Sequence, residues 1–325
     1  MRPSRERERY FLNQPHRVPL GYEQYAGDKQ FATTLARGIE LLRCFTAEHN
    51  ELSNGELSQR TGLPRPTISR LTYTLTALGY LRHDARTGRY ALGSALIAAT
   101  YPLMASIPLR QQARPLMNAL ADATGAHVSM GLRDRLDIVL VETSRLPARE
   151  IQRAQIDGGT HGTRGRSGHV GAMADIGLTL PIVGSAIGRA YLAGLPAESR
   201  EALLNEIRVK APEDWARFEA GMRAAVREHT RHGFCTMDGE LVSEVLAVGA
   251  AYGTLRGGET VVFNAAFQRS AVPGRGLAWL KAEIGPRLVR MVQALREGRP
   301  ADPGGAPDAA GEPLRSPGRS AARRG

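Results

Sequence analysis

A chain of 325 residues is longer than the size at which one hydrophobic core usually stops growing, so its length predicts two domains. Hydrophobic residues make up 42% of the chain and aromatic residues 6%, which indicates cores packed mainly by aliphatic side chains. The formal net charge of +11 at pH 7 favours a polyanionic partner, with nucleic acid first and an anionic membrane second.

The cysteines and the first residues indicate the compartment. Cys44 and Cys235 lie far apart in sequence among apolar neighbours, which predicts buried free thiols and a reducing environment. The opening stretch MRPSRERERYFLNQPHR lacks the apolar region of a signal peptide, and no segment reaches the roughly 18 apolar residues that span a bilayer. We therefore expect a cytoplasmic protein with no membrane partner.

Composition divides the chain into five segments. Residues 1–29 are polar and residues 299–325 are rich in Pro, Gly, Ala and Arg, so both are expected to be disordered. Residues 30–92 show helices and then a hairpin, and residues 93–107 form one apolar helix. Residues 108–298 alternate between helical and strand-like runs, as in an α+β domain.

Three short helices are expected in the first domain. An apolar face at helical spacing on the first of them is formed by Leu35, Ile39, Leu42 and Phe45. Ser53 precedes Glu56 by the spacing of a capping box, so a second helix begins there. Gly62 suits a left-handed end to that helix, and Pro66 suits the first turn of the third.

The third helix has two different faces. Its apolar side, expected to point inward, consists of Ile68, Leu71, Leu75 and Leu78. The candidate DNA-contacting residues on the other side and in the first turn are Arg65, Pro66, Thr67, Ser69, Arg70 and Tyr73, with Thr74 at the margin. A solvated bundle helix is the alternative, but such helices usually mix both charge signs, and no Asp or Glu occurs from Thr61 to Leu81. The pattern predicts a helix-turn-helix.

The stretch GYLRHDARTGRYALG predicts a hairpin directly after this helix. A hairpin in that place is the wing of a winged helix. Arg82, Arg86 and Arg89 would lie along it, within reach of phosphates and the minor groove. The expected partner is therefore double-stranded operator DNA.

The segments LARGIELLRCF, LSNGELSQRTGLPRPTISRLTYTLTALGYL and GRYALGSALI resemble the N-terminal domain of the IclR family of bacterial transcriptional regulators in order and spacing. The resemblance implies a ligand-responsive DNA-binding regulator with a GAF-like effector-binding domain. It leaves open a constitutive repressor whose C-terminal domain only oligomerises. An enzyme is disfavoured, because the chain lacks a Gly-x-Ser-x-Gly elbow and an HExxH motif.

The rest of the chain is similar to the effector domain of that family. The segment GLTLPIVGSAIGRAYLAGLP resembles its Gly-x-x-x-Pro stretch, which leads into a helix at Ser185. The resemblance implies that a small organic acid binds there, with its carboxylate against the amides of Ala186 and Ile187. A helix N-terminus favours such an anion, although a plain capped helix is the alternative.

Several polar positions of the family's pocket differ in this chain. A frequent acidic residue, a cysteine and two serines are replaced by Met237, Ala247, Asn264 and Ala266. The usual His and Lys of the first pocket loop are Val183 and Arg189. The resemblance therefore implies a more apolar pocket for an aromatic or acyl acid, with Asn264 as its polar anchor.

The linker helix GSALIAATYPLM is apolar nearly all round, with a break expected at Pro102. A helix of this kind needs a partner, so a homodimer or homotetramer is expected. No cofactor or metal is predicted. The inserted stretch Gly158–Asp175 contains His161 and His169 but no Walker spacing and no cysteine ligand, and is expected to be a mobile surface loop.

Overall fold

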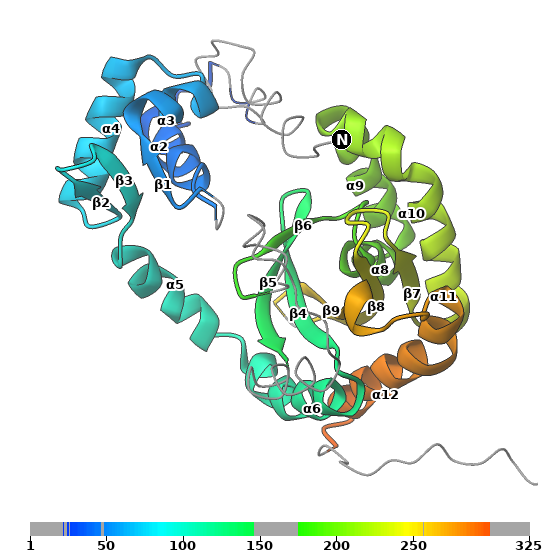
Figure 1. The fold of residues 1–325 in the computed structure, drawn as a ribbon. Coiled ribbons are helices and arrows are strands. Elements are labelled where there is room, and N and C mark those ends of the chain that lie inside the picture. The colour runs from blue at the N-terminus through cyan, green and yellow to red at the C-terminus, as the bar shows by residue number, and fades with distance from the viewer. Residues whose placement is uncertain are drawn as a thin grey trace, which may run out of the picture.

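The computed structural model describes residues 22, 25, 27–46, 49–145, 175–255 and 257–299. The expected N-terminal arm, C-terminal tail and inserted loop lie almost entirely outside the described residues. Figure 1 shows a small N-terminal unit joined by the helix α5 (Ala95–Ala105) to a larger unit built on a six-stranded sheet. The α+β class is confirmed.

The small unit has the expected three helices and a hairpin. Its elements are α2 (Thr33–Arg43), α3 (Asn54–Thr61), α4 (Arg65–Ala77), β2 (Leu81–Asp84) and β3 (Arg89–Leu92). A further strand, β1 (Glu51–Ser53), pairs antiparallel with β3, so the sheet order is β1-β3-β2. Three residues are too few to show an alternating pattern, which is why the sequence did not reveal β1.

The core of this unit corrects two expectations. Leu35 and Ile39 are 64% and 44% exposed, so the apolar face expected on α2 is only partly buried. The buried side of α2 instead runs through Gly38 and Leu41. Leu78, the C-cap of α4, is 61% exposed, so the inward side of this helix ends at Leu75, which is half-buried.

Both signals at the ends of α3 are confirmed. The Ser53 hydroxyl accepts a hydrogen bond from the Glu56 amide at 3.3 Å, and a Glu56 carboxylate oxygen accepts one from the Ser53 amide at 2.8 Å. Gly62 ends the helix with a φ of 68°, which glycine adopts without steric cost. These local bonds set the direction in which the chain enters α4.

The larger unit is an antiparallel sheet of order β6-β5-β4-β9-β8-β7. The strands are β4 (His127–Asp134), β5 (Asp137–Ser144), β6 (Thr179–Pro181), β7 (Cys235–Asp238), β8 (Val245–Thr254) and β9 (Thr260–Gln268). One face packs against α6 (Pro108–Thr124) and α12 (Gly285–Arg296), and the helix α11 (Leu277–Trp279) with a π-helical stretch (Leu280–Ile284) leads into α12. The other face packs against α8 (Ala186–Gly194), α9 (Ala197–Lys210) and α10 (Pro212–His232). Apolar cores therefore lie on both faces of the sheet.

The linker helix differs from the expectation at Pro102, since α5 continues through this proline to Ala105. None of its eleven residues is buried. Within the described part of the chain, no helix has both the length and the apolar character required to cross a membrane.

The capping box predicts a pH-dependent contribution to stability. The Ser53 amide, followed by the Ser53 hydroxyl and Arg89, lowers the pKa of Glu56 from 4.5 to about 2. The carboxylate therefore stabilises the folded state above pH 4.5, and this contribution is lost as the pH falls towards 2. Glu56→Gln should lower the urea midpoint at pH 7, and the difference from the parent should shrink at pH 4 and again at pH 3. Glu51→Gln is the matched control, and a pH-independent difference for Glu56→Gln would contradict this assignment.

Candidate nucleic-acid interface and effector site

The outer side of α4 is the first candidate site. Burial of Ile68 and Leu71 turns Arg65, Ser69 and Arg70 to solvent. Tyr73 is 77% exposed on the same side. Pro66 is exposed and Thr67 half-buried in the first turn, while the Thr74 hydroxyl donates to the Arg70 carbonyl at 2.9 Å. The structure thus brings the expected residues of α4 together on one side of a helix that carries no acidic residue.

Thr72 is a positioning residue that the sequence reading missed. Its side chain is fully buried, and its hydroxyl lies 3.0 Å from the Ile68 carbonyl and 3.3 Å from Asn54 Oδ1. Asn54 is the first residue of α3, so this contact joins the start of one helix to the middle of the next. Only the tertiary structure reveals it, because a threonine at a helix margin carries no such signal.

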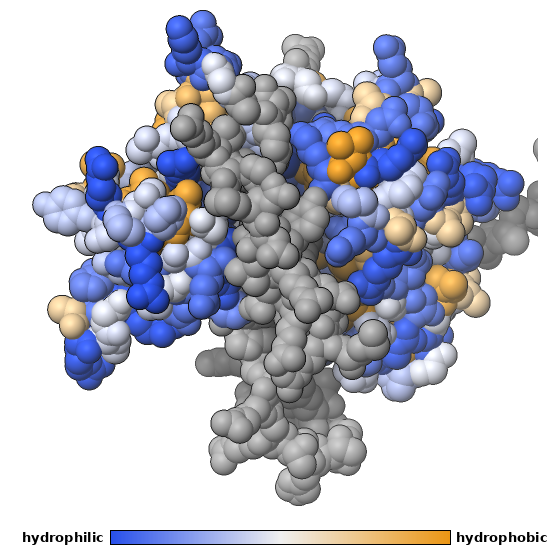
Figure 2. All heavy atoms as spheres, turned by 90° about the horizontal axis from the view of Figure 1, so that it is seen from above, coloured by the Kyte–Doolittle hydropathy of each residue, from blue (hydrophilic) through white to orange (hydrophobic). Residues whose placement is uncertain are grey.

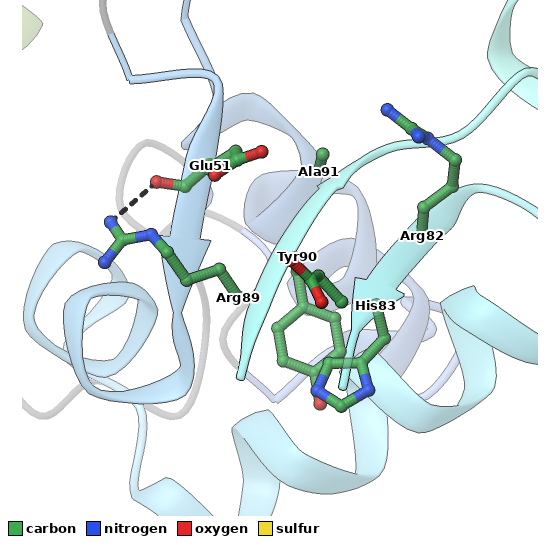
Figure 3. Close-up of a pocket in the computed structure, with 7 residues that line it drawn as sticks. Glu51, Arg82, His83, Arg89, Tyr90 and Ala91 are labelled. Atoms are coloured by element: carbon green, nitrogen blue, oxygen red, sulfur yellow. Dashed lines mark hydrogen bonds between the residues drawn. The ribbon is translucent and has the colours of Figure 1, made fainter. Parts of the chain in front are cut away.

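The three arginines of the wing differ in where their side chains lie. Arg86 is exposed in the turn, where its amide donates to Asp84 Oδ1 at 2.8 Å. Figure 3 shows Arg82 extending away from the sheet, apart from the His83 and Tyr90 rings, whose centroids are 4.6 Å apart. A shallow hollow of about 90 Å³ on this face is lined by both acidic and basic groups, and we assign no ligand to it.

Arg89 departs from the expectation of a DNA contact. Its Nη2 donates to the Glu51 carbonyl at 2.9 Å, drawn as a dashed line in Figure 3, and to Glu56 Oε1 at 3.0 Å. Both bonds tie β3 to β1 and to the capping box of α3. The guanidinium therefore holds the wing against the helices, and we leave Arg89 out of the proposed DNA contacts.

Figure 2 shows a mostly hydrophilic surface over the small unit, at the left of that view, with scattered apolar side chains between the polar ones. Large apolar side chains are exposed on α2, at Leu35 and Ile39, and on α5, at Ile97, Tyr101 and Leu103.

The start of α8 is the second candidate site. Ser185 is its N-cap, with a hydroxyl that accepts from the Gly188 amide at 3.1 Å and donates to the Pro181 carbonyl at 2.7 Å. That hydroxyl is fully engaged in the cap. Ala186 and Ile187 follow in the first turn and are 1% and 0% exposed. The Ile187 side chain packs in a different cluster, with Ile138 and Tyr191, so only its amide remains a candidate ligand contact.

Three of the expected pocket residues meet Ala186. Met237, Ala247 and Ala266 are register partners on β7, β8 and β9, and the four side chains form one buried cluster. Leu241, from the loop between β7 and β8, packs against this cluster. Val245 also packs against it, so the apolar part of the candidate pocket is occupied by side chains in this structure.

Asn264 lies two residues before Ala266 on the same face of β9, and it is 4% exposed. Among the described residues, no donor meets its Oδ1 atom. A buried polar atom without a partner costs about 1–3 kcal/mol, so such an atom calls for an explanation. Ser129 is its register partner on β4, and the Thr143 hydroxyl lies 3.2 Å from the Ser129 hydroxyl. This polar row across three strands was not evident from the sequence, because only the register aligns its members.

Arg189, at the position where the resemblance implies a lysine, is 1% exposed and forms a bidentate ion pair with Glu240. Its Nη1 and Nη2 lie 2.9 and 2.6 Å from the Glu240 oxygens, and its Nε donates to the Val183 carbonyl at 2.8 Å. The charge of Arg189 is thus already neutralised within the protein.

Both cysteines are free thiols, as expected. Cys235 is buried and Cys44 half-buried, and burial raises the pKa of each thiol to about 12. No cluster of His, Cys, Asp or Glu that could hold a metal occurs in the described ranges, and His161 and His169 fall outside them.

Known proteins similar to this chain identify its family. The model of the IclR helix-turn-helix domain matches residues 34–85. The HTH-type transcriptional regulator TsaQ1/TsaQ2 of Comamonas testosteroni is 32% identical over 81% of this chain and 87% of its own. An IclR family transcriptional regulator from Brucella abortus superposes with a TM-score of 0.67 at 37% identity, covering 84% of this chain and 94% of that one.

A more distant structure shares the fold. It is an IclR homolog from Microbacterium hydrocarbonoxydans complexed with 4-hydroxybenzoate, with 18% identity and a TM-score of 0.55 over 82% of this chain and 96% of that one. The domain match covers the small unit, and the two nearer relatives each cover more than four fifths of the chain. The chain belongs to the IclR family of transcriptional regulators.

Proposed function

We propose that this regulator binds operator DNA with α4 in the major groove and the wing over the adjacent backbone. The observation that carries the proposal is the exposed, acid-free face of α4 formed by Arg65, Ser69, Arg70 and Tyr73. Arginine can bond two acceptors of a guanine edge, while serine and tyrosine hydroxyls suit phosphates or base edges. Arg82 and Arg86 add phosphate contacts from the wing.

Replacing the helix arginines should separate base reading from phosphate binding. Arg65→Ala and Arg70→Ala should each cost about 1–3 kcal/mol of operator affinity and relax specificity at one position. Arg86→Ala should instead weaken binding to all sequences alike and reduce the salt slope by about 1. Gel shifts on operator and unrelated DNA measure both effects, with Arg290→Ala on α12 as a control of equal charge. Operator binding by both helix variants at the level of the parent would rule out α4 as the recognition helix.

We further propose that a second copy of the chain covers α5, giving a homodimer or a homotetramer made from such dimers. Ile97 and Tyr101 lie one turn apart on α5 and are 75% and 71% exposed. An apolar helix with no buried residue gains free energy by packing against another such surface. Two recognition helices are also what a two-fold operator requires.

A charge on α5 should therefore disrupt the assembly. Ile97→Glu would place a carboxylate in the apolar interface, and we expect a monomer in light scattering at micromolar concentration with strongly reduced operator binding. Ala99→Glu changes the opposite side of the same helix and serves as the control. A dimer of unchanged stability in Ile97→Glu would show that α5 is not the interface.

For the larger unit we propose an effector site for a small organic acid with an aromatic or acyl body. The amides at the start of α8 suit a carboxylate, and the cluster of Met237, Ala247 and Ala266 suits an apolar body once Leu241 moves aside. Asn264 Oδ1 would then accept a hydrogen bond from the ligand. The close packing of this cluster also supports a second candidate, in which the domain only oligomerises and repression is constitutive.

Asn264→Leu distinguishes the two candidates. It removes a buried unsatisfied acceptor, so the unfolding temperature without ligand should rise. Benzoate, 4-hydroxybenzoate and hexanoate should include an acid that raises the unfolding temperature of the parent by mass action. Only 4-hydroxybenzoate carries a hydroxyl that can donate to Asn264 Oδ1, so its shift should exceed that of benzoate in the parent and lose this excess in the variant. Ser144→Ala is the control, because it removes a buried hydroxyl that also has no partner among the described residues but lies on the opposite face of the sheet. This variant should keep the ligand response. If no acid shifts the parent, the constitutive candidate is preferred.

A further inference from the structure

The small unit touches the sheet of the larger one through two ion pairs of opposite polarity. Arg135 Nη2, in the turn between β4 and β5, lies 2.5 Å from Glu40 Oε1 on α2. Next to it, Arg43 Nη2 of α2 lies 3.4 Å from Oδ2 of Asp134, the last residue of β4 before this turn. Each element thus supplies one acid and one base, so only one relative placement satisfies both pairs.

An aromatic side chain completes this contact. The Arg135 guanidinium lies 4.7 Å from the centre of the Tyr22 ring, and the Tyr22 hydroxyl is 3.4 Å from Glu40 Oε1. The ring of Tyr22 in turn packs near Tyr25 and Phe31, whose own rings stack at 4.7 Å. Tyr22 and Tyr25 lie in the arm that was expected to be disordered, and they cluster here with Phe31 of the small unit.

The conformation of the turn between β4 and β5 indicates that the contact of Arg135 with Glu40 is specific. Among the described residues, Arg135 is the only one other than glycine with a positive φ, 56°. This conformation costs free energy for any residue that has a side chain. The Arg135 carbonyl accepts a hydrogen bond from Arg133 Nε at 2.6 Å, and Arg133 pairs with Glu206 on α9 at 3.2 Å. The Glu40 side chain is only 16% exposed, and burial raises its pKa, so its charge depends on the surrounding donors. The two contacts of Arg133 therefore stabilise the turn conformation in which Arg135 reaches α2.

The strand β4, which leads into this turn, also reaches the candidate effector site. It ends at Asp134 and carries Ser129, the register partner of Asn264. A Cβ built on Gly131 would lie 2.9 Å from Ile187 Cδ1, so α8 rests directly on this strand. A ligand that moves α8 or β4 would move the turn as well.

We propose that Tyr22, Glu40, Arg43, Asp134 and Arg135 form an interdomain clamp that holds the DNA-binding unit against its own effector unit. The closed clamp fixes the orientation in which α4 meets DNA, and its release by a shift of β4 is the route by which the effector site acts on operator binding. The second statement rests on the proposed function, whereas the contact itself does not.

Charge exchange tests the clamp. Arg135→Glu and Glu40→Arg each place like charges together, and the double variant restores an ion pair of reversed polarity. In the full-length protein without DNA, each single variant should speed amide hydrogen exchange in α2 and in the 134–137 turn, and the double variant should return it towards the parent. Operator affinity should fall about fivefold in the single variants and recover in the double variant. Arg290→Glu changes the net charge as Arg135→Glu does, at an exposed site on α12, and should alter neither measurement.

Arg43→Gln is the milder variant should a reversal prevent folding, and it should raise exchange in the same two segments to a smaller extent. Exchange in the single variants equal to that of the parent, or a double variant no better than either single one, would overturn the clamp. Failure of the parent to bind operator would refute the proposed function, while the exchange data would still decide whether the clamp exists.

Discussion

Burial of Ile68 and Leu71 against Leu41 and Leu57 is the contact on which the DNA-binding surface depends. A helix with one apolar side must bury it, and the opposite side then faces solvent whatever it carries. In α4 that opposite side carries arginine, serine and tyrosine without a carboxylate. The polar groups that α4 exposes are thus determined by which side of the helix is buried in the core.

The neighbouring elements keep α4 in that position. The capping box of Ser53 and Glu56 begins α3, and Gly62 ends it with the turn that admits α4. Arg89 bonds the same Glu56 and so attaches the wing to the helices. One carboxylate therefore serves the helix start and the wing together, which explains why an arginine expected to meet DNA is engaged within the fold.

In the larger unit, one buried polar atom lowers stability at the place where we propose that a ligand binds. Most of its sheet is apolar on both faces, yet Asn264 is buried with an acceptor that no donor among the described residues meets. Such an atom lowers the stability of the unliganded protein and gains a partner only if something binds. Leu241 packs against the apolar cluster beside it, so a ligand bound there would have to displace an apolar side chain and also donate a hydrogen bond to Asn264.

Local signals in the sequence predicted much of this structure, and long-range features escaped them. The capping box, Gly62, Pro66 and the hairpin depend on residues close in sequence, and the structure confirms each of them. The exposure of Leu35 and the continuation of α5 through Pro102 depend on neighbours that sequence periodicity does not contain. The polar row of Ser129, Thr143 and Asn264 needs strand register, and the Arg135–Glu40 pair needs the relative placement of two units. The DNA-facing and pocket residues stay predictions.

Methylation interference on an operator fragment bound by the full-length protein tests the placement of α4 in the major groove most directly, because methylation at guanine N7 blocks contacts there. We predict interfering guanines in two groups about one helical turn of DNA apart, one for each copy of α4. Replacing Arg65 or Arg70 by alanine should remove interference at one guanine of each group. Undiminished binding to operator methylated at every guanine N7, with interference only at adenine N3 in the minor groove, would contradict it.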